Sequence, residues 1–210
     1  MKIFNIVFVL LFSIPLLYSQ DFTTKNFNDY YIDQFVVKDF DKDGDLDIFG
    51  IDFPFSPDAT IYLFLNDNPF FTAVKKDILY SNYTCSGKPY SFDIDNDGDF
   101  DVILAKGDSL NIVAFINDGK AKFTEKRLNI NGSDNFNVID IDNDGDLDIM
   151  GVNRQSKKIN AYINDGTNNY MTKQISVSTL NETIESFQAA DIDGDGDGDF
   201  CIGYLSYFDE

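Results

Sequence analysis

One nine-residue pattern of aspartates, D-x-D-x-D-G-D-x-D, occurs four times in this chain. The copies are called loop 1 (residues 39–47), loop 2 (93–101), loop 3 (140–148) and loop 4 (191–199). Five carboxylates so close together repel one another unless a cation lies among them. Calcium takes about six to eight oxygen ligands, whereas magnesium keeps more of its water. The pattern therefore predicts up to four Ca²⁺ sites.

The order of residues within each loop supports this interpretation. Side chains at positions 1, 3 and 5 can turn toward one point, and Gly at position 6 allows a sharp bend because it tolerates positive φ. Position 7 can offer its backbone carbonyl oxygen, and the Asp at position 9 closes the site. The candidate metal-binding residues are Asp39, Asp41, Asp43, Asp45, Asp47, Asp93, Asp95, Asp97, Asp99, Asp101, Asp140, Asp142, Asp144, Asp146, Asp148, Asp191, Asp193, Asp195, Asp197 and Asp199.

Composition excludes several classes of function. The net charge of −20 argues against a nucleic-acid-binding protein, which needs a basic surface for phosphates. The chain contains no His, so Ser-His-Asp and Cys-His catalysis and the commonest zinc ligand are ruled out. We therefore expect no catalytic residues and no enzyme.

The first 19 residues resemble an export signal. Lys2 is their only charged residue, and residues 3–17 form an almost unbroken apolar run. That run is too short for a confident membrane span, although an uncleaved anchor remains the alternative. We expect a secreted or cell-surface protein without a membrane span in the mature chain. Export also leaves open whether Cys85 and Cys201 form a disulfide or stay as free thiols.

The loops recur within a longer repeat of strands. Each loop follows a short apolar strand and leads directly into a second one. A third strand ends in Asn-Asp, which is hairpin chemistry, and a fourth follows it. The loops start 54, 47 and 51 residues apart, a period typical of the four-stranded blades of a β-propeller. The predicted units are residues 34–81, 86–130, 135–178 and, as a partial unit, 186–210, with residues 20–33 as a lead-in or outer strand.

An EF-hand is the closest alternative for the loops. It needs a bidentate Glu at position 12 and flanking helices. Position 12 is instead occupied by Gly50, Leu104, Gly151 and Ile202, and the flanks are strand-like. The fold class predicted is therefore all-β, with three full four-stranded antiparallel units and a partial fourth.

Two of the units carry the resemblance to a known family. Loop 3 is followed by Ile149-Met-Gly151, then by Asn164-Asp-Gly166 and Tyr170; loop 2 is followed by Asn117-Asp-Gly119 and Phe123. These residues resemble the FG-GAP/VCBS-type repeats of the integrin α-subunit propeller and of many secreted bacterial proteins. The resemblance extends from Gln34 to the C-terminus.

The resemblance implies that each loop joins two strands of a blade and holds Ca²⁺. Positions 1, 3, 5 and 9 would bind through their side chains. Position 7 would bind through its carbonyl oxygen, its carboxylate lying in solvent or around the coordination sphere. Propellers of this family usually have about seven blades. A small closed ring, an open arc, a fragment of a larger propeller and assembly with another chain are therefore all open.

These observations predict an exported calcium-binding repeat module that binds an extracellular protein or glycan. The resemblance alone suggests adhesion. The alternatives are a non-catalytic accessory domain or fragment of a larger secreted enzyme that acts on polysaccharide, and a truncated product of a broken gene.

Overall fold

The computed structural model describes residues 32–55, 58–66, 74–106, 111–130, 135–153, 158–166, 169–175 and 183–205. These ranges contain thirteen β-strands and no helix. No helix within them is long and apolar enough to cross a membrane. The predicted export signal and most of the lead-in lie outside the described residues.

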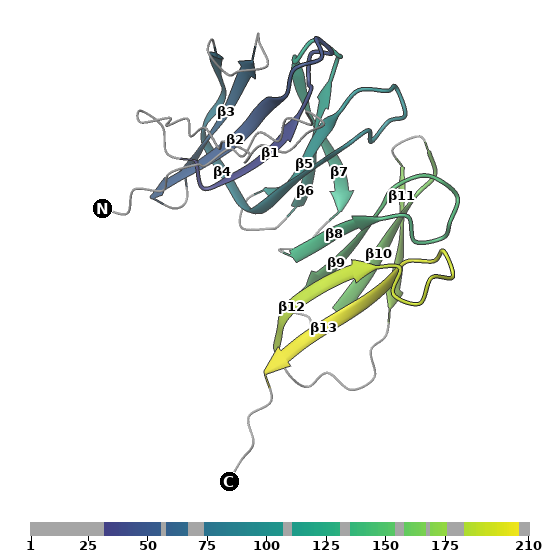
Figure 1. The fold of residues 1–210 in the computed structure, drawn as a ribbon. Helices are drawn as coiled ribbons and strands as arrows, with labels where there is room; N and C mark the ends of the chain where they lie inside the picture. The colour runs from purple at the N-terminus through teal and green to yellow at the C-terminus, as the bar shows by residue number, and fades with distance from the viewer. Residues whose placement is uncertain are drawn as a thin grey trace, which may run out of the picture.

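Most strands are short, and each described pairing is antiparallel and joins strands that are neighbours in sequence. They are β1 (Gln34–Lys38), β2 (Asp47–Phe55), β3 (Asp58–Asn66), β4 (Val74–Phe92), β5 (Asp101–Lys106), β6 (Asn111–Asn117), β7 (Phe123–Ile130), β8 (Asn135–Ile139), β9 (Asp148–Asn153), β10 (Lys158–Asn164), β11 (Tyr170–Ile175), β12 (Thr183–Ala190) and β13 (Asp199–Leu205). Strands β1 to β7 form one continuous sheet, β8 to β11 a second and β12 with β13 a third. Figure 1 shows these sheets following one another through the molecule.

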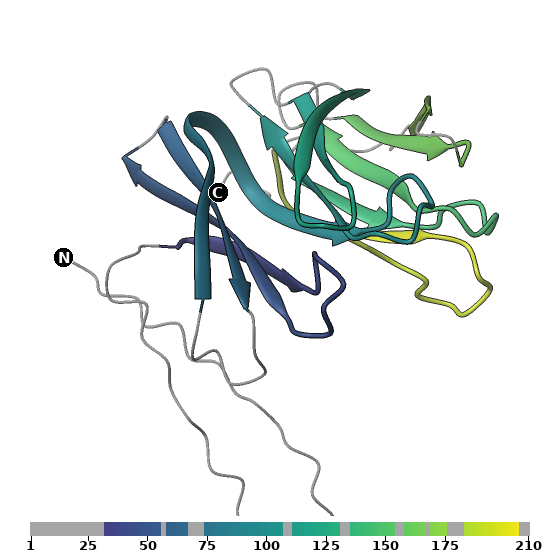
Figure 2. The same ribbon diagram turned by 90° about the horizontal axis from the view of Figure 1, so that it is seen from above.

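The long strand β4 belongs to two repeat units. It pairs with β3 up to Thr84 and with β5 from Cys85 onward. Figure 2 shows it arching from one group of strands to the next. Residues 82–85, which lie between the first two predicted units, therefore belong to a continuous strand. Backbone pairing continues there because the strand changes its partner without interrupting its extended conformation.

With β4 divided in this way, the strands can be grouped into four units. The first unit is β1, β2, β3 and the first half of β4; the second is the rest of β4 with β5, β6 and β7; the third is β8 to β11. The fourth unit has two strands in the described residues, β12 and β13. The prediction of an all-β antiparallel fold is confirmed, and the described strands do not close into a ring.

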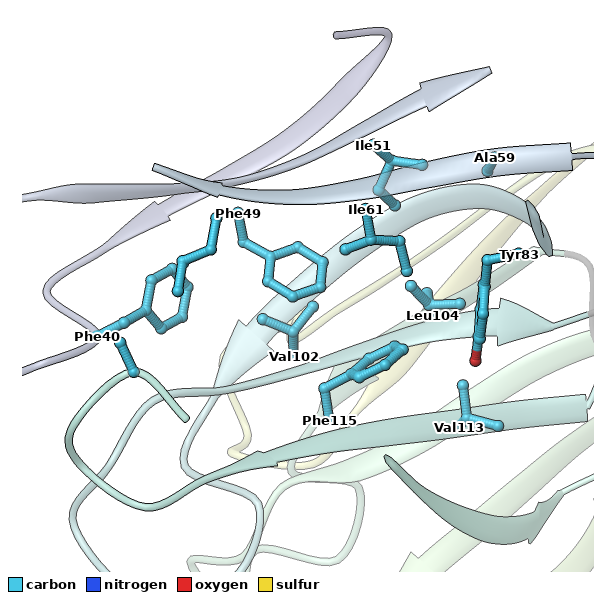
Figure 3. Close-up of a cluster of buried hydrophobic side chains, with 12 residues drawn as sticks. Phe40, Phe49, Ile51, Ala59, Ile61, Tyr83, Val102, Leu104, Val113 and Phe115 are labelled. Atoms are coloured by element: carbon cyan, nitrogen blue, oxygen red, sulfur yellow. The ribbon is translucent and has the colours of Figure 1, made fainter. Parts of the chain in front are cut away.

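A core of aromatic and aliphatic side chains joins the first unit to the second. Phe49 of β2 and Phe115 of β6 are both fully buried, with ring centroids 5.7 Å apart. Figure 3 shows them together with Val102 in the space between the strands of the two units. Burying aromatic rings of this size contributes strongly to stability. The two units are therefore held together by their facing sides.

The middle units are buried on both faces. In β5, Val102 belongs to the core shared with the first unit, whereas its neighbour Ile103 belongs to a core shared with the third. In β9, Ile149 packs toward the second unit and Met150 toward the fourth. Successive side chains of a strand point to opposite faces, so this alternation shows that the units stack face to face.

Both cysteines are free thiols in this structure. Cys85 is partly buried in β4, and burial raises its pKa to about 12. Cys201 is exposed on β13. The fold therefore uses no disulfide within the described part of the chain.

Candidate metal centres

The four acidic loops lie in succession along one side of the molecule, each joining the first and second strands of its unit (Figure 1). In each loop, three carboxylates place one oxygen atom apiece within 4.8 Å of the others. Positions 1 and 3 take part in every group, joined by position 5 in loop 1 and by position 9 in loops 2, 3 and 4. The groups are Asp39, Asp41 and Asp43; Asp93, Asp95 and Asp101; Asp140, Asp142 and Asp148; and Asp191, Asp193 and Asp199.

Each loop winds around the carboxylate at position 1. In loop 1, the backbone N–H groups of Asp43 and Gly44 donate to the two oxygens of Asp39 at 3.1 and 3.0 Å. Loops 2 and 3 repeat both hydrogen bonds. The glycine at position 6 has φ of +94°, +86°, +96° and +95° in the four loops. Such values favour glycine, so this bend is available to the sequence at low cost.

The carboxylate at position 9 joins its loop to the third strand of the same unit. In loop 2, the Asp101 oxygens accept from the backbone N–H of Ile94 at 3.0 Å and of Asn117 at 2.8 Å. Loops 1 and 3 repeat this arrangement. Asp101 is 0% exposed. Each oxygen keeps a second lone pair, so this residue can hold the backbone and still bind a metal ion.

Burial dominates the electrostatics of position 9 in loops 1, 2 and 3. Desolvation raises the pKa of Asp101 to about 7 and that of Asp47 and Asp148 to about 6, although the backbone hydrogen bonds act in the opposite direction. Neighbouring aspartates in the same loop add to the rise in pKa. A buried anion without a cation is costly. In the metal-free loop the protonated form of this group therefore persists to a higher pH than it does for an exposed aspartate.

These raised pKa values predict opposite effects of pH on the metal-free and the metal-bound protein. Between the ordinary pKa of 3.8 and about 6 to 7, the folded chain binds more protons than the unfolded chain. The contribution of these groups to stability without metal should therefore be fully present below about pH 4 and be lost as pH rises through that window. Thermal melts of metal-depleted protein should give a melting temperature about 5 °C higher near pH 5 than near pH 7.5.

The same protons compete with a metal ion for the carboxylates. The stabilisation gained by adding Ca²⁺ should accordingly be smaller near pH 5 than near pH 7.5. Equal gains at the two pH values would contradict a metal role for these groups.

The environment of one buried oxygen atom in loop 2 shows whether that loop suits a cation. The Oδ1 atom of Asp95 is inaccessible to solvent and has no hydrogen-bond donor. It belongs to the group formed with Asp93 and Asp101, in which every side chain is an acid. Leaving such an oxygen without a partner costs about 1–3 kcal/mol or more for a charged group. An oxygen-rich, acceptor-only site of this kind fits a hard divalent cation.

The remaining predicted site residues take other positions. In loops 2, 3 and 4 the carboxylate at position 5 lies outside the three-residue group and accepts from the backbone N–H at position 7; these residues are Asp97, Asp144 and Asp195. In loop 1 the residue at position 9, Asp47, lies outside the three-residue group. Its carboxylate accepts hydrogen bonds from the backbone N–H groups of Phe40 and Asn66. The carboxylates at position 7 also lie outside the groups; these residues are Asp45, Asp99, Asp146 and Asp197.

The position 7 carboxylates in loops 2 and 3 lie against the hairpin of their own unit. A Cβ atom added to Gly119 would lie 2.5 Å from Oδ2 of Asp99, and one added to Gly166 would lie 2.5 Å from Oδ2 of Asp146. Asp99 is 7% exposed. Its carboxylate is therefore buried, whereas the sequence led us to expect solvent or the surroundings of the ion.

Sequence reasoning missed the role of the Asn that ends each third strand. We interpreted Asn117 and its counterparts Asn66 and Asn164 only as part of a turn. Asn117 is 2% exposed and donates through Nδ2 to the carbonyl oxygens of Phe40 and Phe100. Its recurrence just before each hairpin was the available signal. The side chains of Asn117 and Asn164 therefore help to fix the loops to the sheets.

Comparisons with known proteins agree with this repeat geometry. A family model described as an FG-GAP-like repeat matches the chain three times, over residues 39–104, 93–150 and 140–202. Each match begins at the first aspartate of one acidic loop and ends in the strand that follows the next loop. Searches of curated proteins and of solved structures gave no match.

Proposed function

Because the chain belongs to the family of FG-GAP-like repeat proteins, we propose that it is an exported β-propeller module whose acidic loops bind structural Ca²⁺ and whose surface binds a partner. The family is of the β-propeller type and is typical of non-catalytic interaction or adhesion modules. The observation that carries the proposal is the unpartnered, buried carboxylate oxygen of Asp95 within an all-acidic group.

The proposed ligands follow from the described loops. In loop 2, Asp93, Asp95 and Asp101 would hold the ion with their side chains, and Asp99 would add its backbone carbonyl. The bound ion would supply positive charge to carboxylates that otherwise repel one another. It would thereby fix the bend between the first and second strands of the unit.

Stacking of the units supports the propeller. Each described unit packs its face on the next through an apolar core, and the acidic loops share one side. This is the arrangement of propeller blades, whose connecting loops are common sites of recognition. We propose an extracellular protein or glycan as the partner, since the acidic surface is unsuited to nucleic acid.

Calorimetric titration of the metal-depleted full chain with CaCl₂ tests the metal assignment. We expect a stoichiometry of four ions per chain, because four loops carry a suitable group of carboxylates. The variant Asp95→Asn should lower that number by one, because it removes the unpartnered oxygen of loop 2 without removing the buried residue at position 9. Asp118→Asn, an exposed aspartate of the β6–β7 hairpin, is the matched control and should leave it at four.

Absence of binding heat, together with no metal in elemental analysis of folded protein, would refute the calcium assignment. The binding role is tested by probing arrays of glycans and extracellular proteins with the full chain. Retention that requires Ca²⁺ supports a partner-binding module, and no retention in either condition contradicts it.

A further inference from the structure

The side chain at position 4 of a loop extends to the following loop. Lys42 of loop 1 forms an ion pair with Asp99 of loop 2. Asn96 of loop 2 donates through Nδ2 to Oδ1 of Asp146 in loop 3, at 2.8 Å. In both cases the acceptor is the carboxylate at position 7. Residues separated by about one repeat thus meet in the same way at two successive junctions.

At the third junction, loop 3 contacts loop 4. Nδ2 of Asn143, at position 4 of loop 3, lies 2.9 Å from the place where a Cβ of Gly196 in loop 4 would stand. The Gly196 position accepts this approach because it has no side chain. The neighbouring Gly198 also donates its backbone N–H to the carbonyl of Ile141 in loop 3, at 3.4 Å.

The three residues at position 4 share an uncommon backbone conformation. Lys42, Asn96 and Asn143 have φ of +61°, +58° and +58°, in the left-handed region. Asn adopts this conformation more readily than most residues, whereas Lys adopts it rarely. The hydrogen bonds described within each loop are made by the aspartates and backbone groups, and not by these three side chains.

The receiving carboxylates are held from two sides. Asp99 lies between Lys42 and the hairpin residue Gly119, and Asp146 lies between Asn96 and the hairpin residue Gly166. A carboxylate held in this way does not turn into the centre of its own loop. That residue would then contribute to its own loop through its backbone carbonyl oxygen, which is the group proposed to bind the ion.

We propose that Lys42, Asn96 and Asn143 are positioning residues for the metal site of the loop that follows each of them. The calcium affinity of one loop therefore depends on a side chain supplied by the loop before it. This inference rests on the proposed calcium function and concerns a set of residues outside the candidate ligands. Each metal site would then be coupled to the loop that precedes it in the sequence.

Loop 4 supplies the substitution that tests the inference. Its residue at position 4 is Gly194, with φ of +80°, so glycine forms this bend naturally. Asn96→Gly removes the contact to Asp146 without adding charge and without straining loop 2. Lys42→Gly is a poorer test, because it also removes a positive charge near the carboxylates of loop 2.

The glycine at position 6 gives each loop its own reporter. The backbone N–H groups of Gly44, Gly98, Gly145 and Gly196 each donate to the carboxylate at position 1 of their loop. Their amide NMR signals, followed during a Ca²⁺ titration of the labelled full chain, yield one binding midpoint per loop. In Asn96→Gly the Gly145 midpoint should rise about fivefold, as expected for the loss of one hydrogen bond. The Gly98 midpoint should stay within about twofold.

Two further variants make the outcome decisive. Asn143→Gly should raise the midpoint of Gly196 and leave that of Gly145 unchanged. Asn129→Gly, at an exposed strand position with φ of +56°, is the matched control and should alter no midpoint. An unchanged Gly145 midpoint in folded Asn96→Gly, or an equal rise at Gly98, would overturn the inference. If no glycine of the unaltered chain responds to Ca²⁺, the proposed function itself fails.

Discussion

Filling the acidic loops with Ca²⁺ should raise the melting temperature of the full chain by about 20 °C or more. An ion that binds only the folded state adds about 2.7 kcal/mol per site when its free concentration is 100 times Kd. Four such sites would together add about 10 kcal/mol, which is comparable with the whole stability of a typical domain. The metal-free chain must instead fold with clustered carboxylates and buried acids.

Differential scanning calorimetry of metal-depleted protein, with and without CaCl₂, measures this effect. MgCl₂ at the same ionic strength is the control for simple screening of charge, and it should give a much smaller rise because magnesium retains its waters. Identical melting curves with and without CaCl₂ would contradict the structural role assigned to the ion.

The second large effect is expected for Asp101→Ala. The substitution leaves two buried backbone N–H groups, those of Ile94 and Asn117, without their acceptor. Each such loss costs about 1–3 kcal/mol, so the free energy of unfolding should fall by about 3–5 kcal/mol even without metal. Loop 2 would also lose a candidate ligand, which adds to the loss in the presence of Ca²⁺. Urea denaturation in both conditions measures the two parts separately.

The same substitution in loop 4 is the matched control. Asp199 also occupies position 9, but its one described backbone partner is the exposed Ile192. Water can replace the lost acceptor there, so Asp199→Ala without metal should cost about 1 kcal/mol or less. Equal losses for the two variants would mean that burial of position 9 is not the source of the effect.

The strand plan could be predicted because its signals are local. Alternating apolar residues, Asn-Asp-Gly turns and a fixed period are each visible within a few residues. Strand β6 (Asn111–Asn117) and the hairpin after it follow this prediction closely, since Asn117 pairs with Phe123 across the turn. The grouping of positions 1 and 3 in every loop also follows from spacing alone.

The remaining features depend on contacts between units, which one sequence does not reveal. Nothing near Asn96 in the sequence indicates that its side chain meets Asp146, one repeat away. The burial of Asp99 likewise arises from the hairpin of its unit and from the preceding loop. The residue at position 2 shows the same dependence: Ile94 is 1% exposed beneath the next unit, whereas Ile192 is 63% exposed.

The unbroken course of β4 bears on how this array could be shortened or copied. A repeat defined by its aspartates starts at a loop, but the strand before loop 2, β4, is also the last strand of the first unit. Deleting the first repeat at the boundary seen in the sequence would have one of two effects. If all of β4 were removed, β5 would lose its neighbour; if only part of β4 were kept, that part would lack its pairing with β3. The repeat marked by the aspartates and the segment that can be removed without breaking a strand are therefore offset from each other at this junction.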